Sequence, residues 1–300
     1  QQTVVQVLYK DREDVTPKTT YMDYRNFMID DLFSTMITNR LNELVSSENP
    51  PFLYGFAQYG STYARSKKAY RSLALTTPDK VATSLTSLLV ENERVRKYGF
   101  LGSELSRAKL DMLTSYENSF NERDKKNSGE VIGEYIRNFL EQESIPGIDW
   151  EFQFAQTILP SISLEELNAR IEKFLHKDNM VVVLRCPENE ATAGITEDKL
   201  ASVVSDSSKL SIEAYAEEEI RGNLVESLAD SSVIASRNHI DDVDVHQITL
   251  ANGIQVYYKQ TDFQNDEVLV RAYSPGGTSL YALEDHLITS LANPYLDQAG

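Results

Sequence analysis

The pattern of apolar and polar residues predicts one long amphipathic helix, residues 21–45, around which the chain is organised. Its apolar residues recur at the three- and four-residue spacing of one helix face: Ile29, Phe33, Met36, Ile37, Leu41 and Leu44, widened by Tyr24, Met28 and Leu32. A strand is excluded, because alternation would place half of these side chains in water. Residues 52–59 and 69–75 read as strands. This order predicts a helix lying across an antiparallel sheet.

Similar patterns extend through the first 187 residues. Buried strands are predicted at residues 4–9 and 180–184, and helices at 78–97, from 103 onward, and at 128–143, 150–159 and 163–176. The helix at 128–143 is expected to bury its apolar residues, Val131, Ile132, Tyr135, Ile136, Phe139 and Leu140. Ser163 with Glu166 three positions later is a capping-box pattern. The predicted fold class is α+β, with helices packed on one face of a mainly antiparallel sheet.

The composition changes after residue 187. Residues 188–244 are rich in Ser, Ala, Asp and Glu and read as a linker with marginal helices at 196–204 and 213–221. A second unit then starts, with strands at 245–250 and 254–259 around an Asn252-Gly253 turn, a third strand at 267–273 and a helix from about 284. The predicted organisation is therefore a domain at 1–187, a linker at 188–244 and a truncated domain at 245–300. This last part is expected to fold poorly alone, because it leaves a sheet edge and an apolar face uncovered.

The charge balance limits the partners. The 300 residues include 46 acidic and 29 basic ones, a formal net charge of −17. This argues against a nucleic acid or an anionic membrane as partner and indicates solubility, or less strongly a protein that receives cationic peptides. The single cysteine, Cys186, excludes an internal disulfide but leaves the compartment undetermined. The sequence has no apolar run of 18 residues, so membrane insertion is not expected. Because it starts at Gln1 without a methionine or a signal-like core, the chain is expected to be a piece of a longer protein.

Candidate chemical groups are scattered. The four histidines, His176, His239, His246 and His286, lie in no H-x-x-E-H or Cys/His pattern. His176 reads as the end of a helix, where an imidazole suits the helix dipole. The acidic run with His246 (Asp241, Asp242 and Asp244) is a possible metal site but reads more simply as solvated linker.

Other candidate motifs favour structure over chemistry. Gly276-Gly277 could present backbone N–H groups to an anion, but a tight turn is the simpler interpretation. The sequence contains neither G-x-S-x-G nor G-x-x-x-x-G-K-[ST]. On its residues alone the chain reads as scaffold, with no catalytic, cofactor-binding or metal-ligating residue assigned.

Four stretches, taken together, resemble the M16 family of zinc metallopeptidases, the pitrilysin and insulin-degrading-enzyme type. They are residues 38–44 (TNRLNEL) leading into 49–52 (NPPF); residues 98–109 (YGFLGSELSRAK); residues 138–140 (NFL) with 145–148 (IPGI) and 159–160 (LP); and residues 250–256 (LANGIQV) through 261–263 (TDF) to 274–279 (SPGGTS). One departure is Leu101, where similar sequences usually have a capping Thr, and a weaker start of the following helix is expected.

The resemblance implies a peptidase of two halves, each with two domains of one α+β fold, that close around a peptide. Its zinc site, H-x-x-E-H with a further glutamate, would lie in an upstream domain outside this sequence, so zinc is expected there and not in this fragment. At the equivalent register of the third domain stand Ser290, Asn293 and Pro294, none of which can replace a zinc ligand or the base. That domain is thus expected to be a non-catalytic copy.

The interpretation adopted is a non-catalytic part of a zinc-dependent M16-type peptidase, inactive alone. It would form the wall of a peptide-binding chamber and the hinge between the halves. The expected partners are a peptide substrate and the missing domains of the same chain. The localisation is unknown, although the resemblance suggests a periplasmic or exported protein. The alternatives are a structural or binding subunit of the same fold without peptidase activity, and an unrelated α+β interaction protein.

Overall fold

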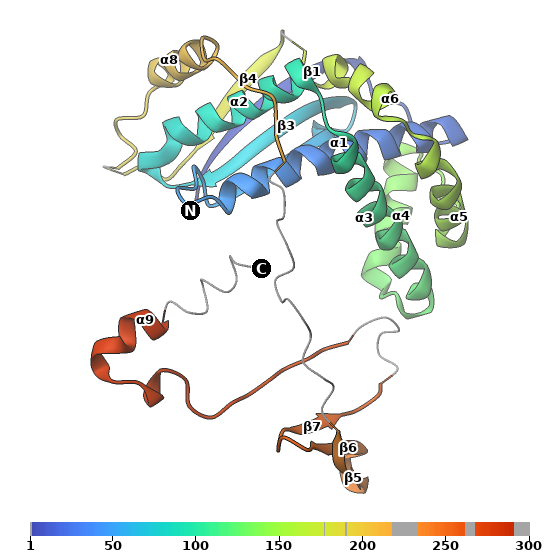
Figure 1. The fold of residues 1–300 in the computed structure, drawn as a ribbon. Coiled ribbons are helices and arrows are strands. Elements are labelled where there is room, and N and C mark those ends of the chain that lie inside the picture. The colour runs from blue at the N-terminus through green and yellow to red at the C-terminus, as the bar shows by residue number, and fades with distance from the viewer. Residues whose placement is uncertain (1, 177, 190, 218–232, 262–267, 291–300) are drawn as a thin grey trace. The chain divides into compact units, whose positions relative to one another are not determined.

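The computed structural model describes residues 2–176, 178–189, 191–217, 233–261 and 268–290. The chain divides into two units, unit 1 (Gln1–Ala216) and unit 2 (Glu217–Gly300) (Figure 1). The predicted boundaries at 187 and 244 stay predictions, since this division does not test them. No helix in the described part of the chain is long and apolar enough to cross a membrane.

Unit 1 is built on a four-stranded antiparallel sheet in the order β2-β3-β1-β4. The strands are β1 (Thr3–Asp14), β2 (Tyr54–Ala64), β3 (Lys67–Thr76) and β4 (Met180–Arg185). Val5 of β1 lies opposite Ala74 of β3 on one side and Leu184 of β4 on the other. β4, which follows the helical region, therefore pairs with β1. The helices between β3 and β4 form one continuous stretch of the chain that leaves the sheet and returns to it.

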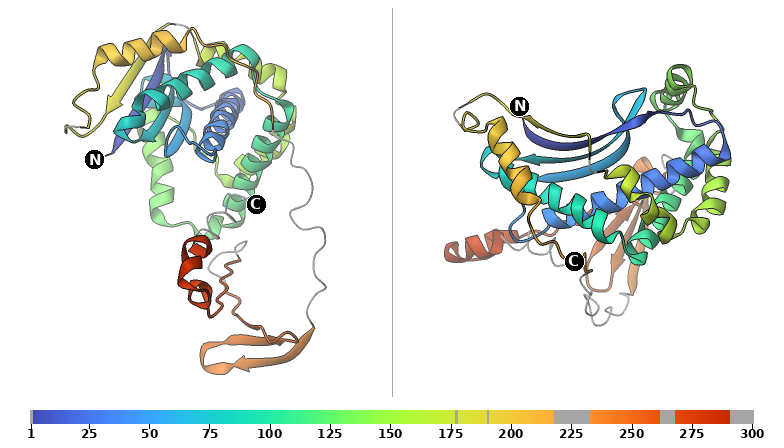
Figure 2. Two further views of the ribbon diagram at one scale, coloured as in Figure 1. Left: turned by 60° about the vertical axis from the view of Figure 1, so that its left-hand side comes forward. Right: turned by 90° about the horizontal axis from the view of Figure 1, so that it is seen from above.

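Helices cover one face of this sheet, as the view from above shows (Figure 2). The long helix α1 (Tyr21–Val45) has the predicted bounds. It begins at Thr20, whose hydroxyl accepts the Asp23 N–H (3.2 Å), while the Asp23 carboxylate accepts the Thr20 N–H (2.8 Å). The Thr20 hydroxyl also donates to the Asp23 carboxylate (2.7 Å), and this hydrogen bond, together with that from the Thr20 N–H, lowers the pKa of Asp23. α2 (Val81–Tyr98), preceded by a 3₁₀ turn at Pro78–Lys80, packs on β1 and β3 beside α1. The predicted α+β fold class is confirmed.

The remaining helices extend this layer. They are α3 (Gly102–Asn121), α4 (Ser128–Glu141), α5 (Ile148–Ile158), α6 (Leu164–Ala169), α7 (Ile171–Phe174) and α8 (Glu197–Ser207). The single helix predicted at 163–176 is two short helices separated at Arg170. Ser163 caps α6 by accepting the Glu166 N–H (3.1 Å), but the Glu166 carboxylate pairs with Arg25 of α1. Leu101 offers α3 no side-chain cap, and its own N–H donates to Glu104 (2.7 Å).

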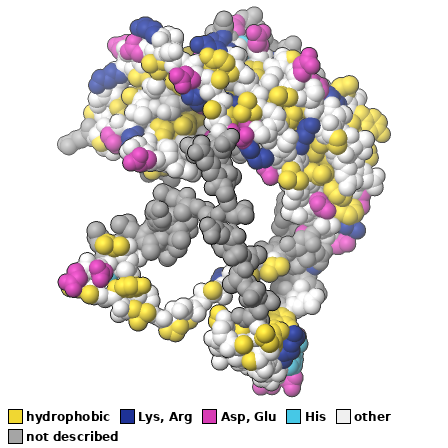
Figure 3. Space-filling model, in the orientation of Figure 1, with side chains coloured by type: hydrophobic (Ala, Val, Ile, Leu, Met, Phe, Trp, Pro, Cys, Tyr) yellow, Lys and Arg dark blue, Asp and Glu magenta, His cyan; other side chains and the backbone are white. Residues whose placement is uncertain are grey.

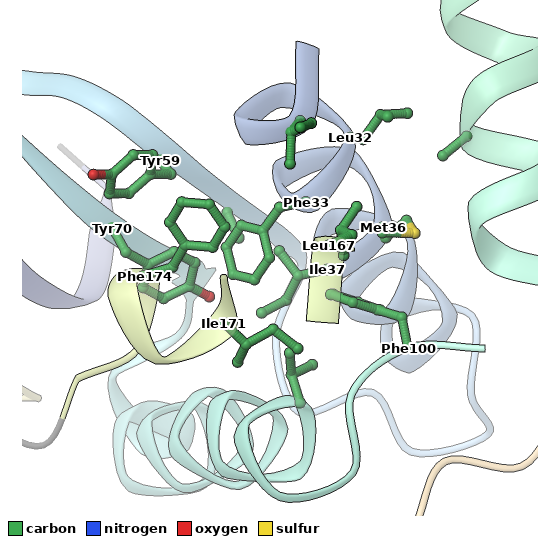
Figure 4. Packing of buried hydrophobic residues seen from close by; sticks show 14 of the residues in the cluster. Leu32, Phe33, Met36, Ile37, Tyr59, Tyr70, Phe100, Leu167, Ile171 and Phe174 are labelled. Atoms are coloured by element: carbon green, nitrogen blue, oxygen red, sulfur yellow. The ribbon is translucent and has the colours of Figure 1, made fainter. Parts of the chain in front are cut away.

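The core of unit 1 lies between α1, the sheet and α7. Phe33 at its centre is fully buried, with its ring centroid 4.3 Å from Phe174 and 5.7 Å from Tyr70 (Figure 4). Phe100, which follows α2, closes the other side at 5.8 Å. The apolar stripe predicted for α1 is buried as expected, apart from Leu44, which is half-buried at the edge of the core.

The prediction that α4 buries its apolar residues is wrong. The exposed fractions are 54% for Ile132, 58% for Tyr135, 49% for Ile136, 84% for Phe139 and 42% for Leu140, and Val131 is half-buried. The periodicity of α4 correctly predicted an amphipathic helix. It does not determine which face is buried, and here the apolar face is exposed.

The first part of the predicted linker packs on unit 1. α8 lies against α2, and Ile212 is buried. Of the two predicted linker helices, the one at 196–204 corresponds to α8. The one at 213–221 is wrong for its described part, because residues 213–217 have no helical structure. Polar composition alone therefore did not reveal that this segment packs on unit 1.

Unit 2 contains a three-stranded antiparallel sheet in the order β5-β6-β7. Its strands are β5 (Ile234–Ile240), β6 (Val245–Leu250) and β7 (Gln255–Tyr258), and a short helix α9 (His286–Ser290) follows. The β6–β7 hairpin turns at Asn252-Gly253 as predicted, with Gly253 at φ +88°. The third strand predicted at 267–273 is wrong for its described part, 268–273, which has no strand structure. The third strand of this sheet is instead β5, which lies in the segment predicted to be a linker.

Candidate functional site

Two of the four histidines form a pair within unit 2. His176 stacks edge-on against Tyr9 at 5.9 Å, and His286 begins α9. His239 and His246 are paired across β5 and β6, with their Nδ1 atoms 3.3 Å apart. His239, not His246, approaches the acidic run, with its Nε2 atom 3.5 Å from Asp241 and 3.4 Å from Asp244.

These side chains do not make up a zinc site. In the described ranges, no group of three or more His, Cys, Asp or Glu side chains is arranged to hold a metal ion. His239 has His246 and the solvent-exposed carboxylates of Asp241 and Asp244 as neighbours. Structural zinc sites instead surround the ion with four ligands in a tetrahedron. Cys186 is half-buried and free.

The remaining sequence candidates are in unit 2. Gly276 and Gly277 both have positive φ (131° and 66°), and the Ser279 hydroxyl donates to the Gly276 carbonyl (2.7 Å), as in a tight turn. Ser290 ends α9. Asn293 and Pro294 lie outside the described residues.

Two adjoining cavities in unit 1 form the best candidate surface for a ligand. The larger, about 790 Å³, lies between the start of α1, the ends of β2 and β3, and α4. The smaller, about 410 Å³, lies between α1, α3 and α5. Asp31, Tyr116 and Glu151 line both. Neither lining includes a histidine or a cysteine among the described residues.

The larger cavity has a mixed-charge lining: Asp23, Asp30, Asp31, Glu141, Glu143 and Glu151 with Lys18, Lys68, Arg137, Arg170 and Lys173. Lys68 pairs with Asp30 (3.0 Å) and Lys18 with Glu143 (2.7 Å). Acidic and basic side chains are similarly interspersed over the visible face of unit 1 (Figure 3). Such a lining can exchange ion pairs with a charged or polar chain segment.

Desolvation shifts the acids of this cavity. Burial raises the pKa of Asp30, although Lys68 opposes the shift. Desolvation also raises the pKa of Asp31, which Lys18 opposes and Asp30 reinforces. The pKa of Glu151 is raised by burial and then by the negative charge of Glu134. Burial in the cavity thus disfavours the ionised form of these carboxyl groups.

Replacing Glu151 with Gln should change how stability depends on pH. Since the folded-state pKa of Glu151 is raised, folding is penalised at neutral pH, and this penalty disappears as the pH falls through the folded and then the unfolded pKa. The native chain should therefore gain stability relative to Glu151→Gln between pH 7 and pH 4. Urea unfolding at both pH values, with the exposed Glu165→Gln as control, measures the difference. A pH-independent difference would contradict the assignment.

A buried ionic cluster joins three helices behind the core, and the sequence analysis missed it. Arg40 of α1 donates to both carboxylate oxygens of Glu104 (2.7 and 2.8 Å), to Glu91 (3.2 Å) and to the Gly99 carbonyl (3.1 Å). The exposed fractions of Arg40, Glu91 and Glu104 are 2%, 1% and 5%. Burial acts to lower the pKa of Arg40, but the hydrogen bonds and charges of Glu104 and Glu91 outweigh it and raise that pKa.

Gly99 completes this cluster. Its φ is +70°, and an added Cβ atom would lie 2.8 Å from the Asn168 side chain, so only glycine fits. Asn168 in turn accepts the Phe100 N–H (3.0 Å). Arg40, Gly99 and Glu104 all fall within the stretches at 38–44 and 98–109 that carry the family resemblance. The shared motif residues therefore hold the fold together.

Comparisons with known proteins agree with this fold. No family model matches the chain. A zinc protease described as PQQL-like, from Arabidopsis thaliana, is 28% identical over 298 residues, which are 99% of this chain and 28% of that protein. The periplasmic protease PqqL from Escherichia coli superposes with a TM-score of 0.64 at 14% identity, covering 87% of this chain and 29% of PqqL. An insulinase family protease from Yersinia pestis gives 0.59 at 13% identity, covering 69% of this chain and 43% of that one.

The predicted relationship to M16-type zinc peptidases is thus confirmed, in sequence by the zinc protease and in fold by the insulinase-type structures. The chain is similar in sequence to the PQQL-like zinc protease and in fold to PqqL. The chain spans less than a third of the length of either relative.

Proposed function

We propose that this chain is a non-catalytic part of a longer zinc-dependent M16-type peptidase. In this proposal unit 1 forms part of the wall of a peptide-binding chamber, and the segment after Ala216 forms the hinge between the halves. The observation that carries the proposal is the match of 99% of the chain to a zinc protease more than three times as long. PqqL is periplasmic, and we extend the proposal to an exported parent protein.

The cavities of unit 1 support the role as a chamber wall. They offer a polar, mixed-charge surface built from more than one element, which can pair with charged side chains of either sign. A peptide held on such a surface would be bound by ion pairs and hydrogen bonds. Zinc, when bound in an upstream domain, would supply the activated water for hydrolysis.

Comparing the longer parent protein with the 300-residue chain tests this function. The parent should contain about one zinc per chain by elemental analysis and cleave fluorogenic peptides, as expected for an H-x-x-E-H site. The 300-residue chain should do neither. Peptide cleavage by the 300-residue chain would overturn the proposal. A parent without zinc and without cleavage would instead favour a structural or binding subunit of the same fold.

The contacts of residues 209–216 support a hinge that starts after Ala216. The Tyr215 hydroxyl donates to Glu43 (2.8 Å to Oε1), and its ring lies 4.2 Å from the Arg40 guanidinium carbon. Tyr98 donates to the Ile212 carbonyl (2.8 Å), and Arg94 donates to the Glu213 carbonyl (3.1 Å). The chain is thus clamped to unit 1 up to residue 215.

Tyr215→Phe should loosen this clamp without unfolding unit 1. The substitution removes the hydrogen bond to a charged acceptor but keeps the ring over Arg40, at a cost of about 1 kcal/mol. Amide exchange of residues 209–216, measured by mass spectrometry, should be roughly fivefold faster as local opening becomes easier. The partly exposed Tyr54→Phe is the control. Unchanged exchange would show that Tyr215 does not hold the segment.

A further inference from the structure

The outward face of α4 is an exposed apolar surface on unit 1. We define it as Ile132, Tyr135, Ile136, Phe139 and Leu140, whose exposed fractions lie between 42% and 84%. These residues occupy one side of a single helix, because their spacings of three and four repeat over two turns. An apolar patch of this kind on a soluble protein is typical of an interaction surface.

The orientation of α4 is fixed by its polar side. Glu134 pairs with Lys126 (3.9 Å) and Arg137 with Glu143 (3.4 Å), while Asn138 donates to the Glu143 carbonyl (2.6 Å). Arg137 and Glu141 also line the larger cavity. The charged side of α4 therefore makes the contacts to the flanking segments and to the larger cavity, while its apolar side is exposed. An ordinary surface helix does the opposite.

The segment after α4 strengthens this orientation. The Ser144 N–H donates to the Lys18 carbonyl (3.0 Å), and Tyr24 donates to the Ser144 carbonyl (2.9 Å). Lys18 reaches Glu143 (2.7 Å). The C-terminal end of α4 is thus tied to the start of α1, and rotating the helix to bury Phe139 would break these contacts.

We propose that the outward face of α4 docks against another domain of the same, longer polypeptide. The length of related chains supports this occupant: the chain covers 28% of the Arabidopsis zinc protease and 46% of the first half of PqqL, so most of such a polypeptide lies beyond the counterpart of this chain. A tethered domain reaches a high effective concentration at the face and covers it without a second molecule. The inference rests on the proposed function, in which this chain is one part of a longer peptidase.

Hydrogen exchange in the longer parent protein and in the 300-residue chain tests the docking. Amides of residues 132–140 should exchange at least about tenfold more slowly in the parent, since burying one large apolar side chain alone is worth more than that factor. Phe139→Ser should remove most of this protection in the parent and leave exchange in the 300-residue chain nearly unchanged. Leu110→Ser on α3, also exposed (64%), is the matched control and should change neither.

Two results would overturn the inference. Equal exchange of residues 132–140 in the parent and in the 300-residue chain would show that no other domain covers the face. A concentration-dependent dimer of the 300-residue chain that protects these residues and is lost in Phe139→Ser would assign the face to a second copy instead. Because the readout is protection and not cleavage, a parent that lacks peptidase activity can still show docking, so the two proposals fail separately.

Discussion

Replacing Arg40 with Ala should destabilise unit 1 by about 3–5 kcal/mol, because it leaves Glu104 buried without its cation and Glu91 with Arg94 alone. Most of this loss comes from the stranded charges and not from the attraction that is removed. Urea unfolding followed by Trp150 fluorescence measures it. Trp150 is the single tryptophan and stacks on Phe154 in unit 1, so the signal reports this unit.

Two variants make the Arg40 experiment specific. Arg96→Ala removes a partly exposed pair with Glu93 on α2, and such surface pairs are worth about 0–1 kcal/mol. A triple variant, Arg40→Met with Glu91→Gln and Glu104→Gln, removes all three charges and should recover part of the stability. If Arg40→Ala cost no more than Arg96→Ala, or the triple variant were worse than the single one, the cluster would not act as inferred.

The long helix could be predicted from sequence because its side chains carry the information themselves. The stripe from Ile29 to Leu41 is apolar, and burial is the state that such a stripe requires. The Arg40 cluster left a weaker signal. Arg40 falls on the same side of the helix as Ile37 and Leu44, so a charge stood inside an apolar stripe. That position indicates a buried, paired cation, but its partners come from α2 and α3 and could not be identified without the fold.

The errors have a common physical cause. The apolar side of α4 was expected to be inside, yet amphipathicity defines two sides and not which one meets the body. Likewise, residues 234–240 are polar enough to read as linker, although β5 pairs with β6 through backbone hydrogen bonds that composition does not report. None of the described side chains of unit 2 is buried. Its strands are therefore held together by backbone hydrogen bonds and not by a hydrophobic core. Hydrophobic patterns do not predict strands of this kind.

The candidate cavity was beyond sequence reasoning for a different reason. Asp31 and Glu151 are 120 positions apart and lie in unremarkable polar contexts. They line the same cavities only because α5 returns along α3 beside α1. The resemblance to the M16 family supplied the class of protein, and its motif residues turned out to be structural, since Arg40, Gly99 and Glu104 hold the helices together.

Phe33→Ala should destabilise unit 1 by roughly 3–5 kcal/mol, the range for removing a fully buried phenylalanine ring. Phe33 contacts rings from three separate parts of the chain, Tyr70, Phe100 and Phe174, so neither the sheet nor the helices can close the cavity alone. Phe27→Ala on the same helix is the matched control. Its ring is 40% exposed and contacts Lys18, so its loss should stay below about 1.5 kcal/mol. Trp150 fluorescence during urea unfolding again reports both values, and equal losses would mean that Phe33 is not the centre of the core.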